Sequence, residues 1–550
     1  MSDYDAIVIG SGAGGMTTSL CLAQAGLKVV MVEQHYVAGG WCHSFNLEGY
    51  HFSPGIHYIG ELGPGQEMRE IYEGLGVAND MEFFELNPDG YEHIVCGQEQ
   101  FDIPKNPKNF ETRLVERFPS EKEGIETFMK MFVQLSNEVA GFRHCKHLGD
   151  MAKNVVKSPN VVRYGLLPFK KVVASFVKDP FLQTILEAQA GDHGLPPSMA
   201  PTVLQAALAT HYWNGAWFPK GGGGAIPKAF IRAFKKVGGK VMLSTEVDEI
   251  LTERSLLGHR AVGVRLRGGD EIRAKYVVSN ADPKIMYGRL LNQNILSAGL
   301  RRKLHKTKYS IAASSLFMAV DMDLRALGLD SGNYWWFKNP DVDSVYAPHH
   351  SFRDLKGSFM NITSHKDPTK ANNGHQTIEA FSILPYELFA AWKDTEFEKR
   401  PEDYTFAKKA IQEGLLETIR TMVPGIDDHI VFSDVATPLT NEHYIRTGYG
   451  SMYGTEKNLK QLLFPYPVKT EIKNLYHCGA STLGHGVAGA TMSGLAAAGA
   501  ILKCSKDDLL SAKGQTLRCY SAEDETTWPK NVVEKVNQKR RQATKKKEAI

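Results

Sequence analysis

The stretch from residue 5 to residue 60 constrains the fold of this 550-residue chain more than any other. Four apolar residues, Ala6 to Ile9, are too few for a helix and end at Gly10, which indicates a buried parallel strand entering a tight turn. The small and apolar residues up to Gly26 predict a helix, and Val29 to Val32 predict a second strand. This order of elements is typical of a Rossmann-type nucleotide-binding fold.

The turn after the first strand carries the spacing G-x-G-x-x-G, at Gly10, Gly12 and Gly15. The first glycine permits the turn, the second lets a pyrophosphate approach the backbone, and the third lets the helix pack closely on the sheet. Glu33 ends the second strand, where a carboxylate accepts hydrogen bonds from ribose hydroxyls. A lone glycine motif also occurs in turns that bind nothing. Here strand, glycines, helix, strand and acid follow in register, which favours a dinucleotide site.

A second glycine pair, Gly39 and Gly40, follows soon after Glu33 and opens a stretch of glycines and aromatic residues. Its landmarks are Gly39, Gly40, Ser44, Gly49, Tyr50, Phe52 and the string Gly55-Ile56-His57-Tyr58-Ile59-Gly60. This pattern closely resembles the start of the FAD-dependent retinol saturase, carotenoid isomerase and phytoene desaturase family, and it is most similar to the retinol saturase branch. The resemblance covers about residues 5 to 505, and it implies FAD.

A chain of this length exceeds what one hydrophobic core normally supports, so at least two domains are expected. The resemblance implies an α/β fold, with a Rossmann-type FAD-binding domain of the glutathione reductase-like, amine oxidase and phytoene desaturase type. An interleaved substrate domain of antiparallel sheet plus helices completes it. We expect the discontinuous FAD-binding domain at 1–75, 218–300 and 432–505. The helical, possible membrane-facing part is expected at 76–217, the sheet-containing part at 301–431, and a basic C-terminal tail at 506–550.

The segment from Leu475 to Leu502 predicts a short strand, a glycine turn and a long buried helix of small residues. The N-terminal amides of such a helix suit an anionic or electron-rich group. The resemblance places Gly479 and Ala480 on the ribityl-phosphate side and Gly486 to Ala490 at the ring edge. Many relatives carry an acid where Ala480 stands, so backbone or Ser481 must supply that contact.

A glycine-rich loop at Lys220 to Gly223 lies beside the flavin on resemblance alone, and a hinge is the other interpretation. Val247, at the start of a predicted strand, is the candidate whose backbone would hold the adenosine end of FAD. The full set of candidate cofactor-binding residues is Gly10, Gly12, Ala13, Gly14, Gly15, Glu33, Gln34, Gly39, Gly40, Ser44, Gly55, Ile56, His57, Lys220, Gly221, Gly222, Val247, Asn280, Gly479, Ala480, Gly486, Val487 and Ala488.

Between residues 300 and 430 lie the aromatic, strand-like segments SSLFMAVDM, NYWWF, GSFMNITSH and QTIEAFSIL. They are consistent with one wall of a substrate cavity or with an ordinary core. A catalytic acid or base must lie near the flavin ring and reach the substrate. By motif position the candidates are His57, Tyr58 and His485, each with a structural role as the alternative.

The resemblance implies an FAD-dependent oxidoreductase that acts on carbon–carbon double bonds of an apolar polyene, a retinoid or carotenoid-like isoprenoid. Saturation is the first expectation. Desaturation and cis–trans isomerisation use the same flavin and remain alternatives, as does a flavin-containing lipid-binding protein without turnover. The external electron donor or acceptor is not predicted.

The amino-acid composition limits which binding partners and which cellular compartment we expect for this protein. A net charge of +3 is too small for 550 residues to indicate nucleic acid. Seven cysteines scattered singly indicate the reduced thiols of a cytoplasmic protein, and no zinc spacing occurs among the 19 histidines, so no metal site is expected. Neither a signal peptide nor a transmembrane segment is visible, which predicts a cytoplasmic location.

Two segments leave a peripheral membrane contact open. Residues 163–178 mix apolar side chains with cations, which fits a helix packed on the core or one that dips into an anionic bilayer interface. From Lys530 onward the chain carries many cations and two acids, Glu534 and Glu548. A solvated helix and a contact with anionic lipid are both compatible with this tail.

Overall fold

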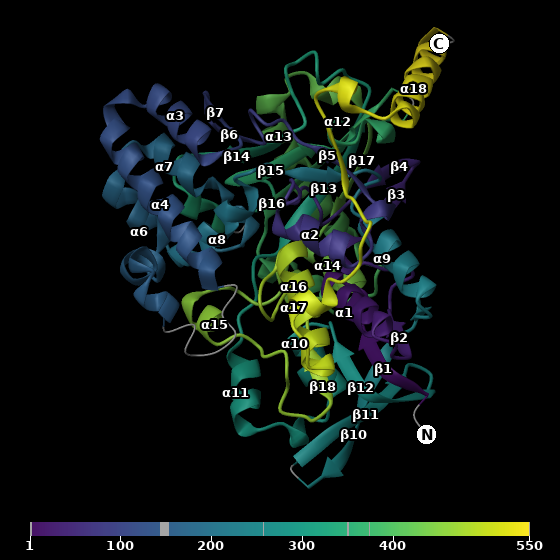
Figure 1. Cartoon of the computed structure of the whole chain (residues 1–550). Helices are drawn as coiled ribbons and strands as arrows, with labels where there is room; N and C mark the ends of the chain where they lie inside the picture. Colours follow the sequence, from purple (N-terminus) through teal and green to yellow (C-terminus); the bar gives the residue numbers. More distant parts are fainter. Residues whose placement is uncertain (1–2, 143–152, 257, 349–350, 373, 549–550) are drawn as a thin grey trace.

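The computed structural model of the chain (Figure 1) describes residues 3–142, 153–256, 258–348, 351–372 and 374–548, the last six of these by their backbone alone. It has a mainly parallel sheet, a second large sheet above it in the view of Figure 1, and a group of helices beside the second sheet.

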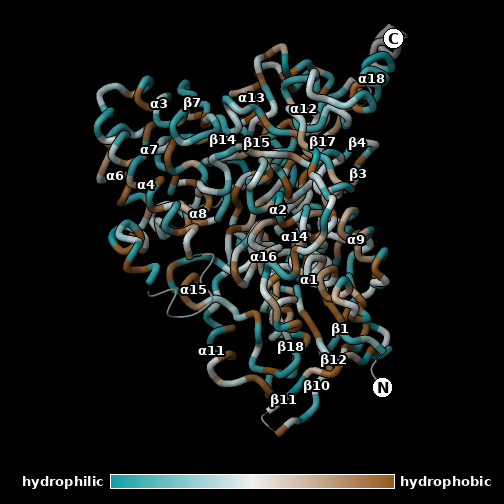
Figure 2. Tube along the Cα trace, viewed as in Figure 1, coloured by the Kyte–Doolittle hydropathy of each residue, from teal (hydrophilic) through white to brown (hydrophobic). Residues whose placement is uncertain are grey.

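The first sheet has seven strands that come from three distant parts of the chain. Its parallel part has the order β18-β12-β1-β2-β9, and β10 and β11 extend β12 as an antiparallel hairpin. Buried hydrophobic residues form most of β1 and the end of β12, where the strands are covered on both faces (Figure 2). The strands are β1 (Tyr4–Ile9), β2 (Val29–Val32), β9 (Lys240–Met242), β10 (Val247–Ser255), β11 (Gly258–Leu266), β12 (Glu271–Ser279) and β18 (Leu475–His477).

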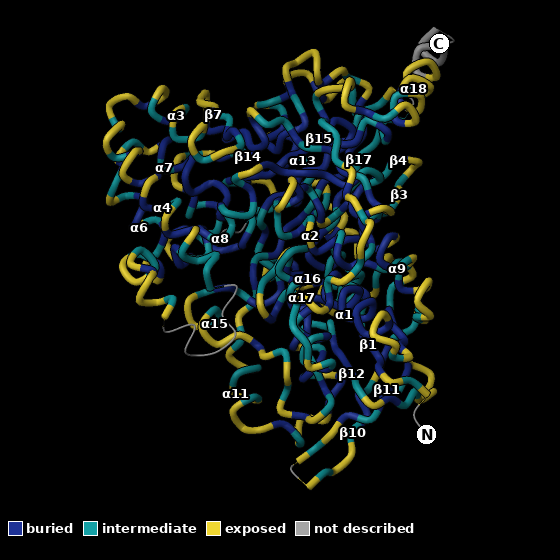
Figure 3. The backbone as a smooth tube through the Cα atoms, in the orientation of Figure 1, coloured by how far each residue is buried: buried dark blue, intermediate teal, exposed yellow. Residues whose placement is uncertain are grey.

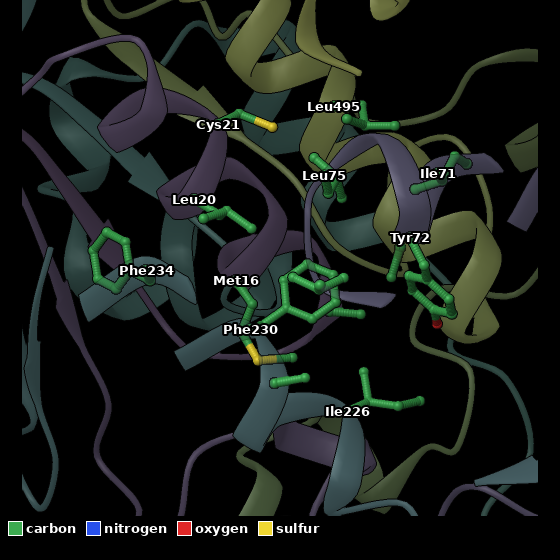
Figure 4. Close-up of a cluster of buried hydrophobic side chains, with 14 of the residues drawn as sticks. Met16, Leu20, Cys21, Ile71, Tyr72, Leu75, Ile226, Phe230, Phe234 and Leu495 are labelled. Atoms are coloured by element: carbon green, nitrogen blue, oxygen red, sulfur yellow. The ribbon is translucent and has the colours of Figure 1, made fainter. Parts of the chain in front are cut away.

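Helix α1 (Ala13–Gln24) lies between this sheet and helix α16 (Gly486–Leu502), and eleven of its twelve residues are buried. Small residues permit the close approach of the two helices: a β-carbon on Gly494 would lie 2.4 Å from the Gly14 carbonyl oxygen. The prediction of a buried small-residue helix is therefore confirmed. Helices α2 (Glu67–Gly74) and α9 (Ala225–Lys236) complete the hydrophobic cluster drawn in Figure 4, where Met16, Leu20, Tyr72 and Phe230 meet.

The second sheet also has seven strands, in the order β17-β13-β16-β15-β14-β6-β7, and all neighbours are antiparallel except β14 and β6. Helix α13 (Glu402–Met422) covers one face and packs on residues such as Leu316 and Met360. The four aromatic segments expected to be strands are strands. The members of the sheet are β6 (Glu92–Cys96), β7 (Glu99–Ile103), β13 (Ala313–Val320), β14 (Asn333–Phe337), β15 (Gly357–Ile362), β16 (Gln376–Ile383) and β17 (Ile430–Ala436).

A group of helices lies at one end of the second sheet, at the left of Figure 1. The helical spacing predicted from Ile125 onward is confirmed by α4, whose Phe128 and Leu135 are buried. None of the helices that the structure describes is long and apolar enough to cross a bilayer. The group consists of α3 (Pro107–Arg117), α4 (Lys122–Phe142), α6 (Phe169–Phe176), α7 (Pro180–Glu187) and α8 (Thr202–Tyr212).

The segment 163–178 divides into a buried and an exposed part. Phe169, Val172 and Val173 of α6 are buried in the helical group, whereas Leu166 and Leu167 are 51% and 46% exposed. Lys170 does not extend into water alone, because it forms ion pairs with Asp341 at 2.5 Å and Asp343 at 2.8 Å. Helix α6 is therefore packed on the hydrophobic core. The exposed apolar side chains of this segment belong to the residues that precede α6.

The C-terminal segment contains the expected, largely solvated helix, but parts of the segment also dock on the rest of the molecule. Strand β19 (Arg518–Ser521) pairs with β5 (Glu82–Glu85), which also pairs with β8 (Trp217–Pro219). Helix α18 (Lys530–Glu548) projects from the molecule and is mostly exposed (Figures 1 and 3), but Val532 and Val536 are buried against Phe84 and Trp528. The tail docks because its two valines lie four residues apart, on one face of the helix.

The remaining helices and strands are short connections. The six cysteines in the described part of the chain carry free thiols, and Cys145 lies outside it. These elements are β3 (Phe45–Leu47), β4 (Tyr50–Phe52), α10 (Pro283–Ile285), α11 (Ala298–Lys306), α12 (Thr363–Lys366), α14 (Pro438–Ile445), α15 (Leu459–Leu463) and α17 (Lys506–Leu509).

Candidate functional site

A cavity of about 260 Å³ lies at the carboxyl ends of β1, β2, β12 and β18. Its walls are the glycine turn after β1, the end of β2, the second glycine pair, the start of β10, the loop after α14 and the turn that leads into α16. In open α/β sheets ligands bind at this end of the strands, so the location agrees with the dinucleotide site expected from the sequence.

Glu33 is buried at one end of this cavity and is held by backbone and side chain. Its Oε2 accepts hydrogen bonds from the Ser11 N–H at 2.8 Å and the Ser11 hydroxyl at 2.7 Å, and its Oε1 accepts one from the His35 N–H at 2.8 Å. Ser11 Oγ in turn accepts a hydrogen bond from the N–H of Gly39, which joins both glycine turns. A carboxylate offers about four acceptor sites, so Glu33 retains capacity for a ribose hydroxyl.

Asn280, at the end of β12, fills the space behind the glycine turn. A β-carbon on Gly12 would lie 2.6 Å from its amide nitrogen, and one on Gly14 would lie 2.7 Å from its amide oxygen. Gly40 of the second glycine pair also lies close to this turn, since a β-carbon on Gly40 would lie 3.2 Å from the Gly12 α-carbon. The glycines are therefore required by contacts within the protein as well as by space for a pyrophosphate.

Two arginines near the adenosine end of the cavity were not found from the sequence. Arg446 lines the cavity, and its Nε is buried without a hydrogen-bond partner in the described structure. Arg289 also lines it and donates to Glu246 at 2.8 Å. An unpaired buried donor of a cationic side chain requires an acceptor, and a phosphate supplies one. The donor set therefore fits a dinucleotide with its anionic phosphates.

Most of the candidate cofactor-binding residues line this cavity. They belong to every wall except the loop after α14, and the segments from which they come lie up to several hundred residues apart. The residues that line it are Gly10, Gly12, Ala13, Glu33, Gln34, Gly39, Gly40, Gly55, His57, Val247, Asn280, Gly479, Ala480, Gly486 and Val487.

The other candidates lie behind the cavity wall. Lys220 forms an ion pair with Glu82 of β5, and the Gly221 N–H donates to Asp367, which follows α12, at 2.6 Å. This loop is therefore held by β5 and by the residue after α12. Ser44 Oγ accepts from the Gly224 N–H at 2.8 Å and serves as a local bridge. The candidates outside the lining are Gly14, Gly15, Ser44, Ile56, Lys220, Gly221, Gly222 and Ala488.

Further lining residues, which the sequence did not reveal, come from loops without a recognisable motif. Tyr444, Met452 and Tyr453 follow or end α14, and His477 ends β18. Burial lowers the pKa of His477 to about 4, so this imidazole is neutral. No local spacing marks these residues, because only the packing of the loop after α14 on the glycine turns brings them to the cavity.

The second sheet presents two rows of side chains on the face opposite α13. Strand register aligns Ser315, Phe381, Phe359, Trp335 and Ile94 in an aromatic row. Residues two positions away on each strand share this face and form a second, polar row. The polar row is Phe317, Glu379, Asn361, Asn333 and Glu92.

His57 lies where the cavity meets both rows. Its ring packs against Phe359 and Phe381, with centroid distances of 5.0 and 5.6 Å. Its Nδ1 lies 3.4 Å from Glu379 Oε2 and 3.2 Å from Asn361 Nδ2. Of the three catalytic candidates, His57 is the one that lines the cavity within the described residues.

Tyr58 and His485 instead meet at Asp192. The Tyr58 hydroxyl donates to the Asp192 carboxylate, and His485 Nε2 donates to the Asp192 carbonyl oxygen at 3.0 Å. Burial, with the Lys457 charge nearby, lowers the pKa of His485 to about 3, and burial raises the pKa of Tyr58 well above its ordinary value. Both side chains are therefore neutral, and their contacts hold the segment around Asp192 against the glycine turn.

Buried ionisable groups continue along the polar row. Lys366, fully buried at the end of α12, donates from Nζ to the His57 carbonyl oxygen at 2.7 Å and to Asn333 Oδ1. Glu92 accepts a hydrogen bond from Trp335 Nε1 at 2.9 Å. Burial lowers the pKa of Lys366 to about 7 and raises that of Glu92.

Comparison with known proteins agrees with this geometry. A family model described as flavin containing amine oxidoreductase matches residues 13–502. All-trans-retinol 13,14-reductase of Danio rerio is 29% identical over 527 residues, with 91% of this chain and 86% of that protein covered. The chloroplastic prolycopene isomerase of Daucus carota is 26% identical over 510 residues, with coverages of 90% and 79%. The crystal structure of an oxidoreductase from Methanosarcina mazei, 16% identical, shares the fold with a TM-score of 0.61, covering 90% of this chain and 99% of that one.

Proposed function

The chain belongs to the flavin containing amine oxidoreductase family, and we propose that it uses FAD to act on a carbon–carbon double bond of an apolar polyene. It is an oxidoreductase with a flavin cofactor. The observation that carries the proposal is the position of His57, which lies between the dinucleotide cavity and the aromatic row of the second sheet.

The residues of the cavity suit FAD in particular. Glu33 would accept the ribose hydroxyls, and the backbone at Gly12, Ala13, Gly39 and Gly40 would approach the pyrophosphate. The unpaired Arg446 donor would compensate phosphate charge. When bound, the flavin supplies transfer of an electron pair or hydride, and the protein supplies its position and electrostatic surroundings.

The aromatic row supports a flat, conjugated substrate. Phe381, Phe359 and Trp335 form a continuous edge of rings, with centroid distances of 4.9 Å for both neighbouring pairs. A small apolar cavity lies beside them, and Phe337 and Tyr346 are also among its lining residues. Ring faces pack well against a planar polyene, and walls that are mostly apolar disfavour a charged amine. The names of the relatives, a retinol reductase and a prolycopene isomerase, agree with a polyene.

Saturation is the direction we propose. The string from Gly55 to Gly60 resembles the saturases, and the identity to the retinol reductase, 29%, exceeds the 26% to the prolycopene isomerase. Isomerisation is the second candidate, since the isomerase is covered over nearly the same length.

The test is a pair of anaerobic incubations, one of chemically reduced and one of oxidised protein, with all-trans-retinol or a longer conjugated isoprenoid. Saturation shifts the substrate absorption to shorter wavelength and adds two hydrogens to its mass. Unchanged mass with altered retention identifies an isomerase, and loss of two hydrogens by oxidised protein identifies a desaturase. A bound polyene that leaves the flavin spectrum unchanged and yields no product contradicts the enzymatic proposal. Mass spectrometry of the apolar extract of purified protein guides the choice of substrate.

We also propose a peripheral contact with an anionic bilayer, made by residues 153–167 and Met199. Here Val156, Val162 and Met199 are 85%, 66% and 46% exposed, and the backbone of Thr202 joins Leu167 near Met199. Exposed lysines and an arginine accompany these apolar side chains. Apolar groups beside cations complement lipid tails and anionic headgroups. The cations are Lys153, Lys157, Arg163 and Lys171.

A further inference from the structure

We infer that His57 and Glu379 form the proton-donating pair of the proposed saturation, with His57 as the donor and Glu379 as the residue that positions its proton. The inference rests on the proposed function, which it deepens. Glu379 lies on β16, at a place in the chain that no motif marks.

Saturation requires one proton from the protein. One carbon of the double bond receives a hydride from the reduced flavin, the two-electron reductant, and the other carbon receives a proton. The π bond breaks, two C–H bonds form, the substrate is reduced and the flavin is oxidised. A group of the protein must therefore lie at the junction of the flavin cavity and the polyene site, and carry an acidic hydrogen.

His57 meets this requirement by its position. Its ring lines the dinucleotide cavity and packs on Phe359 and Phe381 of the aromatic row. In the described part of the chain every polar contact of the ring uses Nδ1, which leaves Nε2 available to a substrate carbon. Tyr58 and His485 are engaged with Asp192 and do not line the cavity.

The surroundings of Nδ1 lack one hydrogen-bond donor. Glu379 is 2% exposed, and its Oε1 accepts from the Ser53 N–H at 2.6 Å, whereas Oε2 is buried without a hydrogen-bond partner in the described structure. Asn361 Oδ1 is a second buried acceptor of this kind. Buried acceptors without a donor cost free energy, and a proton on Nδ1, 3.4 Å from Glu379 Oε2, reduces this cost. Glu379 therefore provides an acceptor that fixes the position of a proton on Nδ1.

Asn361 adapts to either protonation state. Its amide nitrogen lies 3.2 Å from Nδ1 and donates to an Nδ1 that carries no proton, and rotation of the amide by a half-turn presents its unpaired oxygen to an Nδ1 that carries one. Once Nε2 has released its proton to carbon, Nδ1 keeps its own, and the neutral ring remains in place. Water restores the second proton after the product leaves.

The other ionisable groups around the pair lie along the same face. Lys366 of α12 is bound to the His57 carbonyl oxygen, Glu92 of β6 lies beyond Asn333, and Asp192 binds the neighbouring Tyr58. A cationic Lys366 opposes a charge on His57. Because burial lowers the pKa of this lysine to about 7, the opposition weakens as pH rises through neutrality.

The test uses flavin-loaded protein with Glu379→Gln and His57→Gln, and Glu92→Gln as the matched control. Glu92 is a buried carboxylate of the same polar row, two strands from Asn361 and without contact to His57. Flavin content and the unfolding midpoint identify variants that fail to fold. In wild-type protein in D₂O, two solvent deuteriums enter the product, because the transferable hydrogen of a reduced flavin exchanges with solvent as the His57 proton does.

We expect His57→Gln and Glu379→Gln to lower the rate of product formation by about 100-fold or more with little change in KM. The readout that needs no turnover is carbethoxylation of His57 by diethyl pyrocarbonate at a fixed pH, followed by peptide mass spectrometry. Its rate should differ from that of wild type by about threefold or more in Glu379→Gln, because the acceptor that positions the Nδ1 proton is lost, and stay constant in Glu92→Gln.

Two results separate this inference from the proposed function. Failure of wild-type protein to convert any polyene overturns the function. Conversion by wild type that persists at full rate in His57→Gln, or an unchanged carbethoxylation rate in folded Glu379→Gln, overturns the pair and leaves the function intact.

Discussion

The side-chain oxygen of Asn280 accepts a hydrogen bond from the backbone N–H of Gly15 at 3.0 Å, which ties the end of β12 to the first turn of α1. The two residues are 265 positions apart in the sequence. Gly15 ends the glycine turn on which the pyrophosphate is proposed to rest, so Asn280 supports this turn directly. A change at the glycine turn therefore disturbs the nucleotide cavity and its supporting strand together.

Replacement of Gly12 by Val should abolish flavin binding. The new β-carbon would lie 2.6 Å from the Asn280 amide nitrogen and would also occupy the approach of the pyrophosphate. The absorbance of the purified protein at flavin wavelengths measures the loss. Gly299→Ala on α11 is the control, since its β-carbon meets nothing closer than 3.8 Å. Full flavin content in Gly12→Val, or NAD recovered in its place, would contradict the assignment.

Arg446→Gln should weaken flavin binding by about tenfold or more, because a charge-assisted hydrogen bond contributes about 1.5–3 kcal/mol. Arg446 Nε is buried at the cavity without a partner in the described structure, so the arginine is available for a phosphate. Titration of flavin-free protein with FAD gives the Kd. Arg267→Gln, which removes an exposed partner of Glu246, is the control and should leave the Kd unchanged. Equal affinity in both variants would remove Arg446 from the site.

Binding to anionic vesicles should weaken when Lys157 and Lys171 are both changed to Glu, since each surface cation contributes about 1 kcal/mol. Salt should weaken it further. Lys170 is left unchanged, because it pairs with Asp341 and Asp343 within the protein. The control is Lys236→Glu on α9, on the opposite side of the molecule in Figure 1. The membrane proposal is contradicted if the protein does not float with the vesicles. It is also contradicted if flotation responds neither to salt nor to the double change.

Glu187→Gln should stabilise the protein increasingly as pH rises from 5 to 8. Burial raises the pKa of Glu187 to about 8, and its Oε1 is buried without a partner in the described structure. Between the ordinary pKa of 4.5 and about 8 the folded state holds this proton and the unfolded state does not, so stability falls with rising pH. Each pH unit in this window costs at most about 1.4 kcal/mol.

Thermal unfolding at pH 5, 6.5 and 8 measures the effect of Glu187→Gln. The exposed Glu116 on α3, changed to Gln, supplies a baseline for the loss of a surface carboxylate. A gain in midpoint that is the same at all three pH values would mean that Glu187 is ionised in the folded protein throughout.

The nucleotide-binding half of the protein could be predicted because its signals are local. The strand from Ala6, the turn at Gly10 to Gly15, and the acid at Glu33 lie within one short stretch, and their spacing follows from backbone geometry. The helical spacing from Ile125 and the small residues of α16 predicted their helices for the same reason. The resemblance at both ends of the chain added the flavin.

The geometry of the proposed proton-donating site depends on tertiary structure. Asn361 and His57 lie 304 residues apart, and only the pairing of β14, β15 and β16 decides that Asn361 shares a face with Glu379 and Phe359. A shift of register by one residue would turn Glu379 toward α13. The sequence therefore determined the elements and the nucleotide turn, whose geometry is local. The folded chain decided which side chains meet, because register and packing between distant segments are set by the free energy of the whole structure.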